Sequence, residues 1–352
     1  MSAETGLGGW IDGSAGGVNA VAWLVALALV VAAGTFFLAP GLAAYPLGAV
    51  AIVVAYGWLA DEATTARTLA LAATVATVSV LGLITIYLVA KSLPAFRIMG
   101  LDVLTKTDGT LWASSVPVYS LVPMIWGTLL ATLIATAIAA PLGIAGAVFI
   151  SEMAPDWARS LLKPAIEMLA GVPSIVYGFI GFALLNQFMA DEFGLPTCGS
   201  LFVVGCVIGA MALPTVVSVA EDAITSVPGR MKDGSLALGA TGWQTTTDVT
   251  VPAAFSGVSA AVLLGVGRAV GETMAAVVIL ANVTELPEPL YDVFGNTITL
   301  TSLIASQYDN ASGTHMNALF AAGVVLFVTV LGLSLGSQYV ERRMQRKLGG
   351  SE

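Results

Sequence analysis

Two oppositely charged residues lie inside a long apolar stretch of the chain. Between Pro252 and Ala281 the only ionisable residues are Arg268 and Glu272. An arginine at the centre of a membrane helix costs about 2.5–3.5 kcal/mol on insertion scales, so we expect Arg268 to face a polar interior. Its planar guanidinium suits the oxygen atoms of an oxyanion and stays ionised in a partly dry channel.

Glu272 lies four residues after Arg268, so on one continuous helix the two side chains would share a face. Glu272 would then hold Arg268 in place between turnovers and reduce the positive field, so that a passing anion is attracted without being trapped. The alternative is a purely structural ion pair within the helix bundle. Against it, such a pair is replaceable by apolar residues at little loss of stability.

Hydroxyl groups in neighbouring apolar segments are further candidates for lining a polar path: Thr273, Ser174 and Tyr177. Each of these hydroxyls has an equally good structural interpretation, a hydrogen bond to its own helix backbone or to a neighbour. We expect Gly171 and Pro173 to break the helix that contains them rather than to touch a substrate.

A second candidate site is a hydrophilic loop of residues 221–253, here called the docking loop, which is long for a connection without a function. Asp233 is a candidate cap for a short helix that Gly239 would end. Such an exposed helix is typical of an element that docks onto a soluble partner. Its apolar anchors would be Leu236, Leu238 and Trp243.

The elements that must position these residues are membrane helices. The 352 residues are 57% hydrophobic and 10% charged, with a mean hydropathy of +0.91, whereas soluble domains carry about 25% charged residues. Uncharged runs long enough to cross a bilayer recur along the chain. The sequence predicts an all-α polytopic protein with eight helices, at 20–39, 42–60, 68–90, 121–150, 165–189, 200–220, 254–281 and 317–339.

The same composition excludes several other classes of protein. The 13 basic residues are spread thinly, whereas a nucleic-acid binder needs a concentrated basic face. Cys198 and Cys206 have no metal-ligand spacing, which argues against a metal site.

The distribution of lysine and arginine predicts the orientation, because cytoplasmic segments accumulate these residues. With eight spans, three basic residues fall on one side: Lys91, Arg97 and Lys106. Nine fall on the other: Arg67, Arg159, Lys163, Arg230, Lys232, Arg342, Arg343, Arg346 and Lys347. We therefore expect a multi-pass plasma-membrane protein with both termini cytoplasmic and with residues 91–120 and 282–316 outside.

The docking loop has the spacing found in permease subunits of type I ABC importers. Those read Glu-Ala-Ala, three residues, Gly, nine residues, Ile, one residue and Leu-Pro. This chain reads Asp233-Gly234-Ser235, three residues, Gly239, nine residues, Val249, one residue and Val251-Pro252. The spacing is complete and Gly239 and Pro252 are identical, whereas the opening tripeptide differs.

Three further segments resemble the PstC-type permease of phosphate ABC importers over about residues 121–340: Leu169–Gly178, Leu238–Thr245 and Gly267–Ala275. The partner permease PstA usually reads Gly-Glu-Thr-Ala-Pro where this chain has Gly271-Glu272-Thr273-Met274-Ala275, which favours PstC.

The resemblance implies a MetI-like permease that pairs with a PstA-like permease, stands on two PstB-like ATP-binding subunits and receives phosphate from an external PstS-like protein. Glu272 could then accept a hydrogen bond from the hydroxyl of phosphate, which sulfate lacks. The chain has no Gly-x-x-x-x-Gly-Lys-Ser/Thr segment, so we expect it to bind no cofactor and to leave ATP and Mg to its partners.

The predicted organisation is a transmembrane hairpin at 1–66, a helix with an external loop at 67–120, a permease core at 121–340 containing the docking loop, and a tail at 341–352. A sulfate or molybdate permease remains an alternative. So does an ion-coupled secondary transporter or channel, in which Arg268 and Glu272 would serve an ion path. A non-transporting scaffold would not need these two charges.

Overall fold

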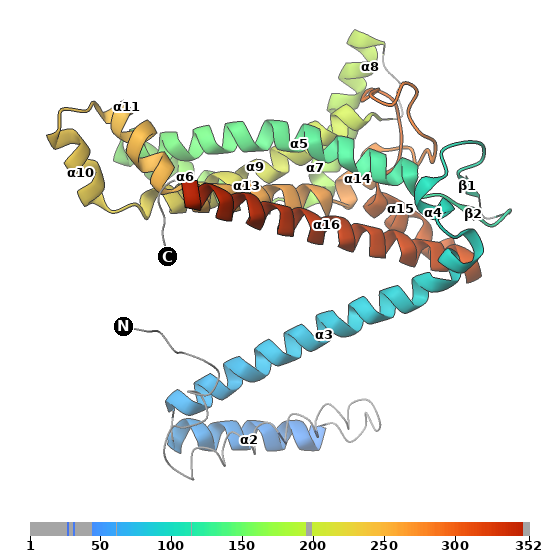
Figure 1. Cartoon of the computed structure of the whole chain (residues 1–352), viewed down its shortest axis with the longest axis horizontal. Coiled ribbons are helices and arrows are strands. Elements are labelled where there is room, and N and C mark those ends of the chain that lie inside the picture. Colours follow the sequence, from blue (N-terminus) through green and yellow to red (C-terminus); the bar gives the residue numbers. More distant parts are fainter. Residues whose placement is uncertain are drawn as a thin grey trace. The chain divides into compact units, whose positions relative to one another are not determined.

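The computed structural model describes residues 27, 31, 44–60, 62–113, 115–194 and 199–347. It divides into two compact units, Met1–Tyr87 and Leu88–Glu352. The described residues are mainly helical, with a two-stranded hairpin and an irregular segment at 280–299 (Figure 1). Each unit is described below by itself.

The first unit contains α2 (Ala44–Ala60) and most of α3 (Glu62–Met99), which continues into the second unit. The α2 boundaries agree with the predicted helix at 42–60, and α3 is longer at both ends than the predicted 68–90. Threonines in α3 donate hydrogen bonds to carbonyls one turn back, Thr74 to Ala70 and Thr85 to Leu81, so their hydroxyls are satisfied in an apolar helix. The helix predicted at 20–39 lies outside the described residues, apart from the helical residues 27 and 31.

The core of the second unit is formed by α5 (Val122–Val148), α9 (Leu201–Thr225) and α13 (Phe255–Val270). Small residues allow these helices to pack closely. A Cβ at Gly205 would lie 2.6 Å from the Ile134 side chain, and one at Gly265 would lie 2.6 Å from Val216. The helices predicted at 121–150 and 200–220 are confirmed as α5 and α9, and both lie at the centre of the bundle.

One end of this unit holds α4 (Asp102–Thr105), the antiparallel strands β1 (Trp112–Ala113) and β2 (Val118–Tyr119), and α15 (Leu300–Gln307) with a 3₁₀ turn, η6 (Tyr308–Asn310). The last helix, α16 (Gly313–Lys347), starts there and runs back along the bundle (Figure 1). The segment predicted as an external loop at 282–316 thus contains a helix with buried side chains, since Leu300 and Leu303 are in the core.

Two predicted helices are each broken in the structure. The span expected at 165–189 is α6 (Asp156–Ala170) followed by α7 (Ser174–Ile180), a π-helical segment, η4 (Gly181–Asn186), and α8 (Gln187–Phe193), with a 90° bend after α6. The span expected at 254–281 is α13 followed by α14 (Met274–Ile279). The break at 171–173 was predicted from Gly171 and Pro173. The interruption of the span at 254–281 was not predicted, because that expectation counted apolar length alone.

The docking loop connects α9 to α13 through four short helical elements: α10 (Gly229–Ala237), α11 (Gly242–Thr245), η5 (Thr246–Thr250) and α12 (Val251–Ala253). A further π-helical turn, η3 (Phe149–Met153), ends α5.

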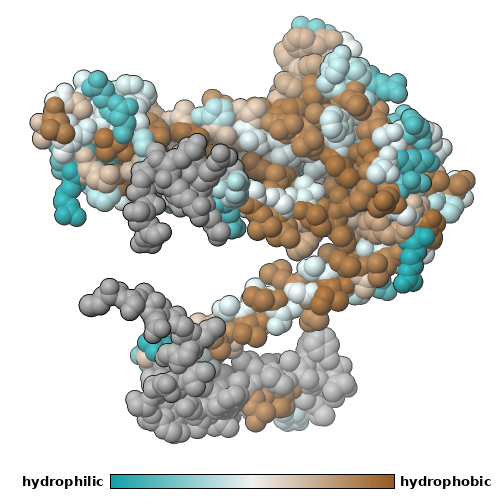
Figure 2. Space-filling view, viewed as in Figure 1, coloured by the Kyte–Doolittle hydropathy of each residue, from teal (hydrophilic) through white to brown (hydrophobic). Residues whose placement is uncertain are grey.

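Four helices of the described part are long and apolar enough to cross a membrane, or up to six spans if each bent pair counts as one. The predicted number of eight is not confirmed. In the second unit, hydrophobic residues cover the sides of the helices, and hydrophilic residues gather around α10 and α11 and around the β hairpin (Figure 2). This distribution is typical of a helical bundle whose sides face an apolar environment.

Candidate functional site

The first candidate site surrounds the break between α13 and α14, at Gly271–Thr273, here called the second break. α13 ends at Val270, and Gly271 is its C-terminal cap. Glycine is among the weakest helix formers, which favours termination here. Helix formation resumes at Met274. Arg268 and Glu272 are consequently not on one continuous helix, and the expected shared face is wrong.

Arg268 points toward α9 rather than toward Glu272. Its Nη1 donates a hydrogen bond of 3.5 Å to Thr215 Oγ1. Its Nε is buried and has no hydrogen-bond partner among the described residues. No ion pair joins Arg268 to Glu272 in the described structure. The guanidinium is therefore a half-buried cation whose Nε donor is unused among the described residues.

Glu272 has a local role that sequence reasoning did not identify. Its Oε1 accepts the backbone N–H of Ala275 at 3.1 Å, so the carboxylate satisfies one of the free N–H groups in the first turn of α14. Its backbone carbonyl accepts the Thr301 hydroxyl at 2.6 Å. Thr301 belongs to α15 and was missed because this contact spans 29 residues.

The first break, at Gly171–Pro173, separates α6 from α7. A residue before proline is disfavoured in helical conformation, so α6 does not continue through Val172 and Pro173. The helix break predicted at Gly171 and Pro173 is therefore confirmed. The hydroxyl of Tyr177 donates to the Leu169 carbonyl at 3.1 Å and so links the two sides of the bend.

The two breaks lie close together because α7 packs on α14. Gly178 makes this approach possible: a Cβ there would lie 2.8 Å from the Ala275 Cα and 3.2 Å from the Ala275 carbonyl oxygen. Ser174 and Tyr177 at the start of α7 are half-buried. The hydroxyl of Thr273 donates to the Gly271 carbonyl at 3.1 Å, the local bond that was the structural alternative for this residue. The structure thus gathers Ser174, Tyr177, Glu272 and Thr273 around two interrupted helices.

The second candidate site is the docking loop. Its first helix, α10, begins at Gly229 rather than at Asp233, which lies inside the helix and does not cap it. Gly239 follows the helix with a φ of +93°, a left-handed conformation that glycine adopts without strain. Two apolar side chains beyond the end of α10 are strongly exposed: Leu238 is 92% exposed and Trp243 is 62% exposed. Leu236 is also exposed.

The second helix of the docking loop, α11, begins with a complete capping box. Thr241 Oγ1 accepts the Gln244 N–H, and the Gln244 side chain accepts the Thr241 N–H at 2.9 Å. This reciprocal pair fixes the start of the helix and so holds the exposed Trp243 in place. Pro252 lies in α12, one residue after its start.

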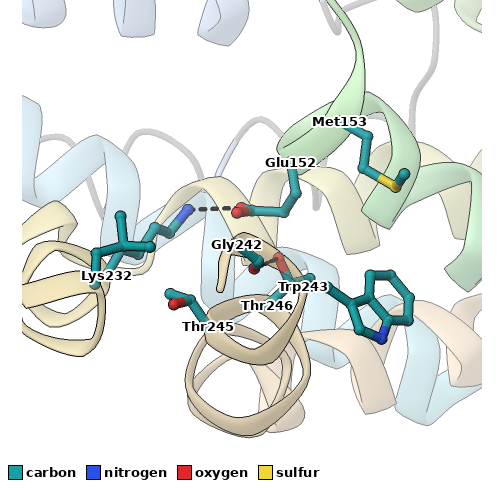
Figure 3. A pocket seen from close by; sticks show the side chains of 8 residues that line it. Glu152, Met153, Lys232, Gly242, Trp243, Thr245 and Thr246 are labelled. Carbon is teal, nitrogen blue, oxygen red and sulfur yellow. Dashed lines mark hydrogen bonds and ion pairs between the residues drawn. The ribbon is translucent and has the colours of Figure 1, made fainter. Parts of the chain in front are cut away.

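A groove of about 430 Å³ separates the docking loop from the end of α5 (Figure 3). Lys232 and Glu152 point toward one another, and Lys232 Nζ lies 2.6 Å from Glu152 Oε1. The residues lining the groove are Glu152, Met153, Lys232, Leu236, Gly242, Trp243, Thr245 and Thr246. The docking loop therefore presents apolar side chains outward while an ion pair connects it to the bundle.

Comparison with known protein families finds one matching model over residues 139–346, described as the inner membrane component of binding-protein-dependent transport systems. The match includes both breaks and the whole docking loop.

Two curated relatives match over most of their length. A probable ABC transporter permease, YqgH of Bacillus subtilis, is 40% identical over 262 residues, covering 74% of this chain and 84% of the relative. The phosphate transport system permease PstC of Pasteurella multocida is 33% identical over 282 residues, covering 74% of this chain and 86% of that protein.

Among solved structures, a bacterial alginate ABC transporter, crystallised with its alginate-bound periplasmic protein, aligns with a TM-score of 0.54. The alignment covers 82% of this chain and 97% of the matched chain, at 17% sequence identity. At that identity the similarity establishes the fold alone.

Proposed function

Since the chain belongs to the family of inner membrane components of binding-protein-dependent transport systems, we propose that it forms, with a second permease subunit, the path by which inorganic phosphate enters the cell. It is a multi-pass permease subunit of an ABC importer and not an enzyme; ATP hydrolysis lies in separate subunits. The phosphate specificity, the identity of the partners and the roles of individual residues belong to the proposal.

The observation that carries the phosphate assignment is the similarity to PstC permeases, which reaches 33% identity across about three quarters of the chain. The relative with 40% identity, YqgH, has no substrate in its description. The assignment is compatible with the chemistry next to the second break, where the half-buried guanidinium of Arg268 has an Nε donor without a partner among the described residues. Guanidinium groups bind phosphate oxygens through paired, charge-assisted hydrogen bonds.

In the proposed complex, the second permease is PstA-like, two PstB-like subunits bind ATP and Mg, and an external PstS-like protein delivers phosphate. The docking loop would contact an ATP-binding subunit through Leu236, Leu238 and Trp243. The site residues Asp233, Gly239 and Pro252 would shape that loop: Asp233 is exposed on α10, Gly239 ends that helix, and Pro252 leads the chain back into α13. Closure of the ATP-binding subunits would then move the bundle.

The test is uptake by the complete complex in proteoliposomes with ATP inside, using radiolabelled phosphate, sulfate and molybdate separately, each with its loaded binding protein. We expect ATP-dependent accumulation of phosphate and little of the other two. Accumulation of sulfate or molybdate in preference to phosphate would contradict the substrate assignment. Uptake by the chain without ATP-binding partners would contradict the importer itself.

A further inference from the structure

The helix that presents the docking surface has almost no apolar attachment to the rest of the protein. None of the nine residues of α10 is buried. Its glycines at 229 and 234 have open space where a Cβ would lie. Since no residue of α10 is buried, a force that a partner applies to this helix passes to the rest of the protein through the covalent chain and through polar contacts.

The strongest of these contacts is the Lys232–Glu152 ion pair. The Nζ–Oε1 distance is 2.6 Å, and the two side chains are only 24% and 11% exposed, respectively. A carboxylate with so little access to water requires a charged or hydrogen-bonded partner. Lys232 is the one ion-pair partner of Glu152 in the described structure, and the pair joins residues 80 positions apart.

Glu152 lies in η3, the π-helical turn that ends α5, and the same turn is held by α6. Arg159 donates from Nε to the Ile150 carbonyl at 2.9 Å and from Nη2 to the Ser151 carbonyl at 2.6 Å. These are carbonyls at the end of a helix, which a cation satisfies well. Glu152, which pairs with Lys232, therefore lies in the same turn as Ile150 and Ser151, whose carbonyls accept hydrogen bonds from Arg159.

One helical turn further along α6, Lys163 lies 2.6 Å from Glu221 and 3.1 Å from Asp222, both at the end of α9. Glu221 is only 6% exposed, whereas Lys163 is 39% exposed and Asp222 is 71% exposed. The carboxylate of Glu221 is therefore shielded from water, while Lys163 and Asp222 remain accessible. Arg159 and Lys163 share one face of α6 because they are four residues apart. The start of α6 is thereby fastened to both α5 and α9.

The far end of α6 leads into the first break, and α7 beyond it packs on α14 at the second break. Two connections therefore run from α10 to the interrupted helices. One is the covalent chain through α11, η5 and α12 to α13. The other runs through space, from Lys232 to Glu152 and η3, then through Arg159 to α6.

We propose that Lys232 is a positioning residue that transmits movement of α10 to the corner between α5 and α6, through its ion pair with Glu152. Without this pair, a partner could still bind α10 and hydrolyse ATP, but α6 would not follow. The inference rests on the proposed function for its transport readout. The physical requirement for such coupling is a contiguous network of packed or hydrogen-bonded groups between the two sites.

The test measures phosphate transported per ATP hydrolysed by the complete complex in proteoliposomes. We expect Lys232→Met to lower this ratio at least fivefold while ATP hydrolysis stays within about twofold of wild type. The matched control is Arg230→Met, which removes the same charge from an exposed position on the same helix. It should leave the ratio unchanged, because any loss of partner binding there would reduce ATP hydrolysis and transport together.

Two more variants separate coupling from folding. Lys232→Met leaves the Glu152 carboxylate, which is only 11% exposed, without a counter-charge, and an uncompensated charge of this kind destabilises a protein. The double variant Lys232→Met, Glu152→Gln avoids that charge and should remain uncoupled. The exchanged pair Lys232→Glu, Glu152→Lys should recover most of the wild-type ratio. A wild-type ratio in the double variant, or no recovery in the exchanged pair, would overturn the proposal.

Hydrogen exchange gives a readout that does not depend on the transported anion. In the wild-type complex, trapping ATP should change amide exchange in residues 149–170, and in Lys232→Met the change should be confined to the docking loop. An unaltered response of 149–170 in the variant would contradict the role of Lys232 even if phosphate were not the substrate. Failure of wild-type phosphate uptake, with the expected exchange result, would contradict only the substrate assignment.

Discussion

At the scale of single residues, Arg268 and Glu272 are the informative pair, and their environments differ. Arg268 has one long hydrogen bond to Thr215 and a buried Nε that has no partner among the described residues. Glu272 uses one carboxylate oxygen to accept the Ala275 N–H in the first turn of α14. A cation with spare donors and an anion with a spare oxygen are chemically suited to bind a partly protonated oxyanion, which offers both acceptors and a hydroxyl.

Replacing Arg268 tests whether its guanidinium group contributes to phosphate transport. We expect Arg268→Gln to lower ATP-dependent phosphate uptake at least about tenfold, since a hydrogen bond to a charged group is worth about 1.5–3 kcal/mol and 1.4 kcal/mol is a factor of ten. Arg268→Lys keeps the charge without the planar fork and should be intermediate. Thr215→Val, which removes only the 3.5 Å contact, is the control. Normal uptake by a correctly assembled Arg268→Gln complex would refute the role.

Replacing Glu272 tests selectivity. Glu272→Gln keeps a carbonyl oxygen for the Ala275 N–H and removes the charge that would accept the hydroxyl of phosphate. We expect the ratio of phosphate to sulfate uptake to fall, measured with each anion in turn and with assembly checked by co-purification. If that ratio is the same as in wild type, Glu272 does not discriminate between the two anions.

At the scale of elements, the two breaks convert predicted spans into pairs of shorter helices that pack through small residues. α7 and α14 meet at Gly178, where the Ala275 backbone leaves no room for a side chain. This contact brings the first and second breaks together, so the geometry around Ser174, Tyr177 and Glu272 depends on it.

A stability measurement tests this contact. Gly178→Ala places a Cβ against backbone atoms that cannot move aside, and such overpacking costs about 1–3 kcal/mol. We expect a lower midpoint of thermal unfolding in detergent. Gly267→Ala is the matched control because nothing lies within 4 Å of its Cβ position, and alanine favours the helix. Equal midpoints for Gly178→Ala and wild type would show that α7 and α14 do not pack this way.

The docking loop offers a second test at this scale. Leu238 is 92% exposed, and a central apolar anchor contributes about 2 kcal/mol or more to a protein interface. We expect Leu238→Asp to weaken binding of the purified ATP-binding subunit at least tenfold in a titration. Leu101→Asp, at an exposed position outside the docking loop, should bind normally. Equal loss in both variants would mean that the effect is not specific to the docking loop.

At the scale of the whole molecule, the chain is one subunit of a larger transport complex. Its sequence has no phosphate-binding loop for ATP, and exposed apolar residues continue along α7 and η4, including Phe179 and Leu184. Such surfaces face either lipid or another subunit.

Reconstitution from purified subunits tests whether transport by this chain depends on its partner subunits. The purified chain alone should neither hydrolyse ATP nor accumulate phosphate in liposomes. Adding the second permease, the ATP-binding subunits and the loaded binding protein should restore both activities, and omitting any one of them should abolish ATP-driven uptake. ATP-dependent uptake by the isolated chain would contradict this assignment.

The sequence alone predicts the membrane class, the positions of most helices and the position of the docking loop, because hydrophobic length and motif spacing are local properties of the chain. The described helices match most of the predicted ranges, and the family assignment is confirmed. The candidate site residues remain predictions, although several of them gather around the two breaks.

The polar groups that contact one another are visible only in the folded structure. Counting four residues from Arg268 to Glu272 assumes an unbroken helix, and the backbone turns between them. Lys232 and Glu152 are 80 residues apart, and Thr301 reaches Glu272 from a segment predicted to be a loop. The partner of a buried polar group is set by packing between distant segments, and a single sequence does not encode those distances in its local pattern.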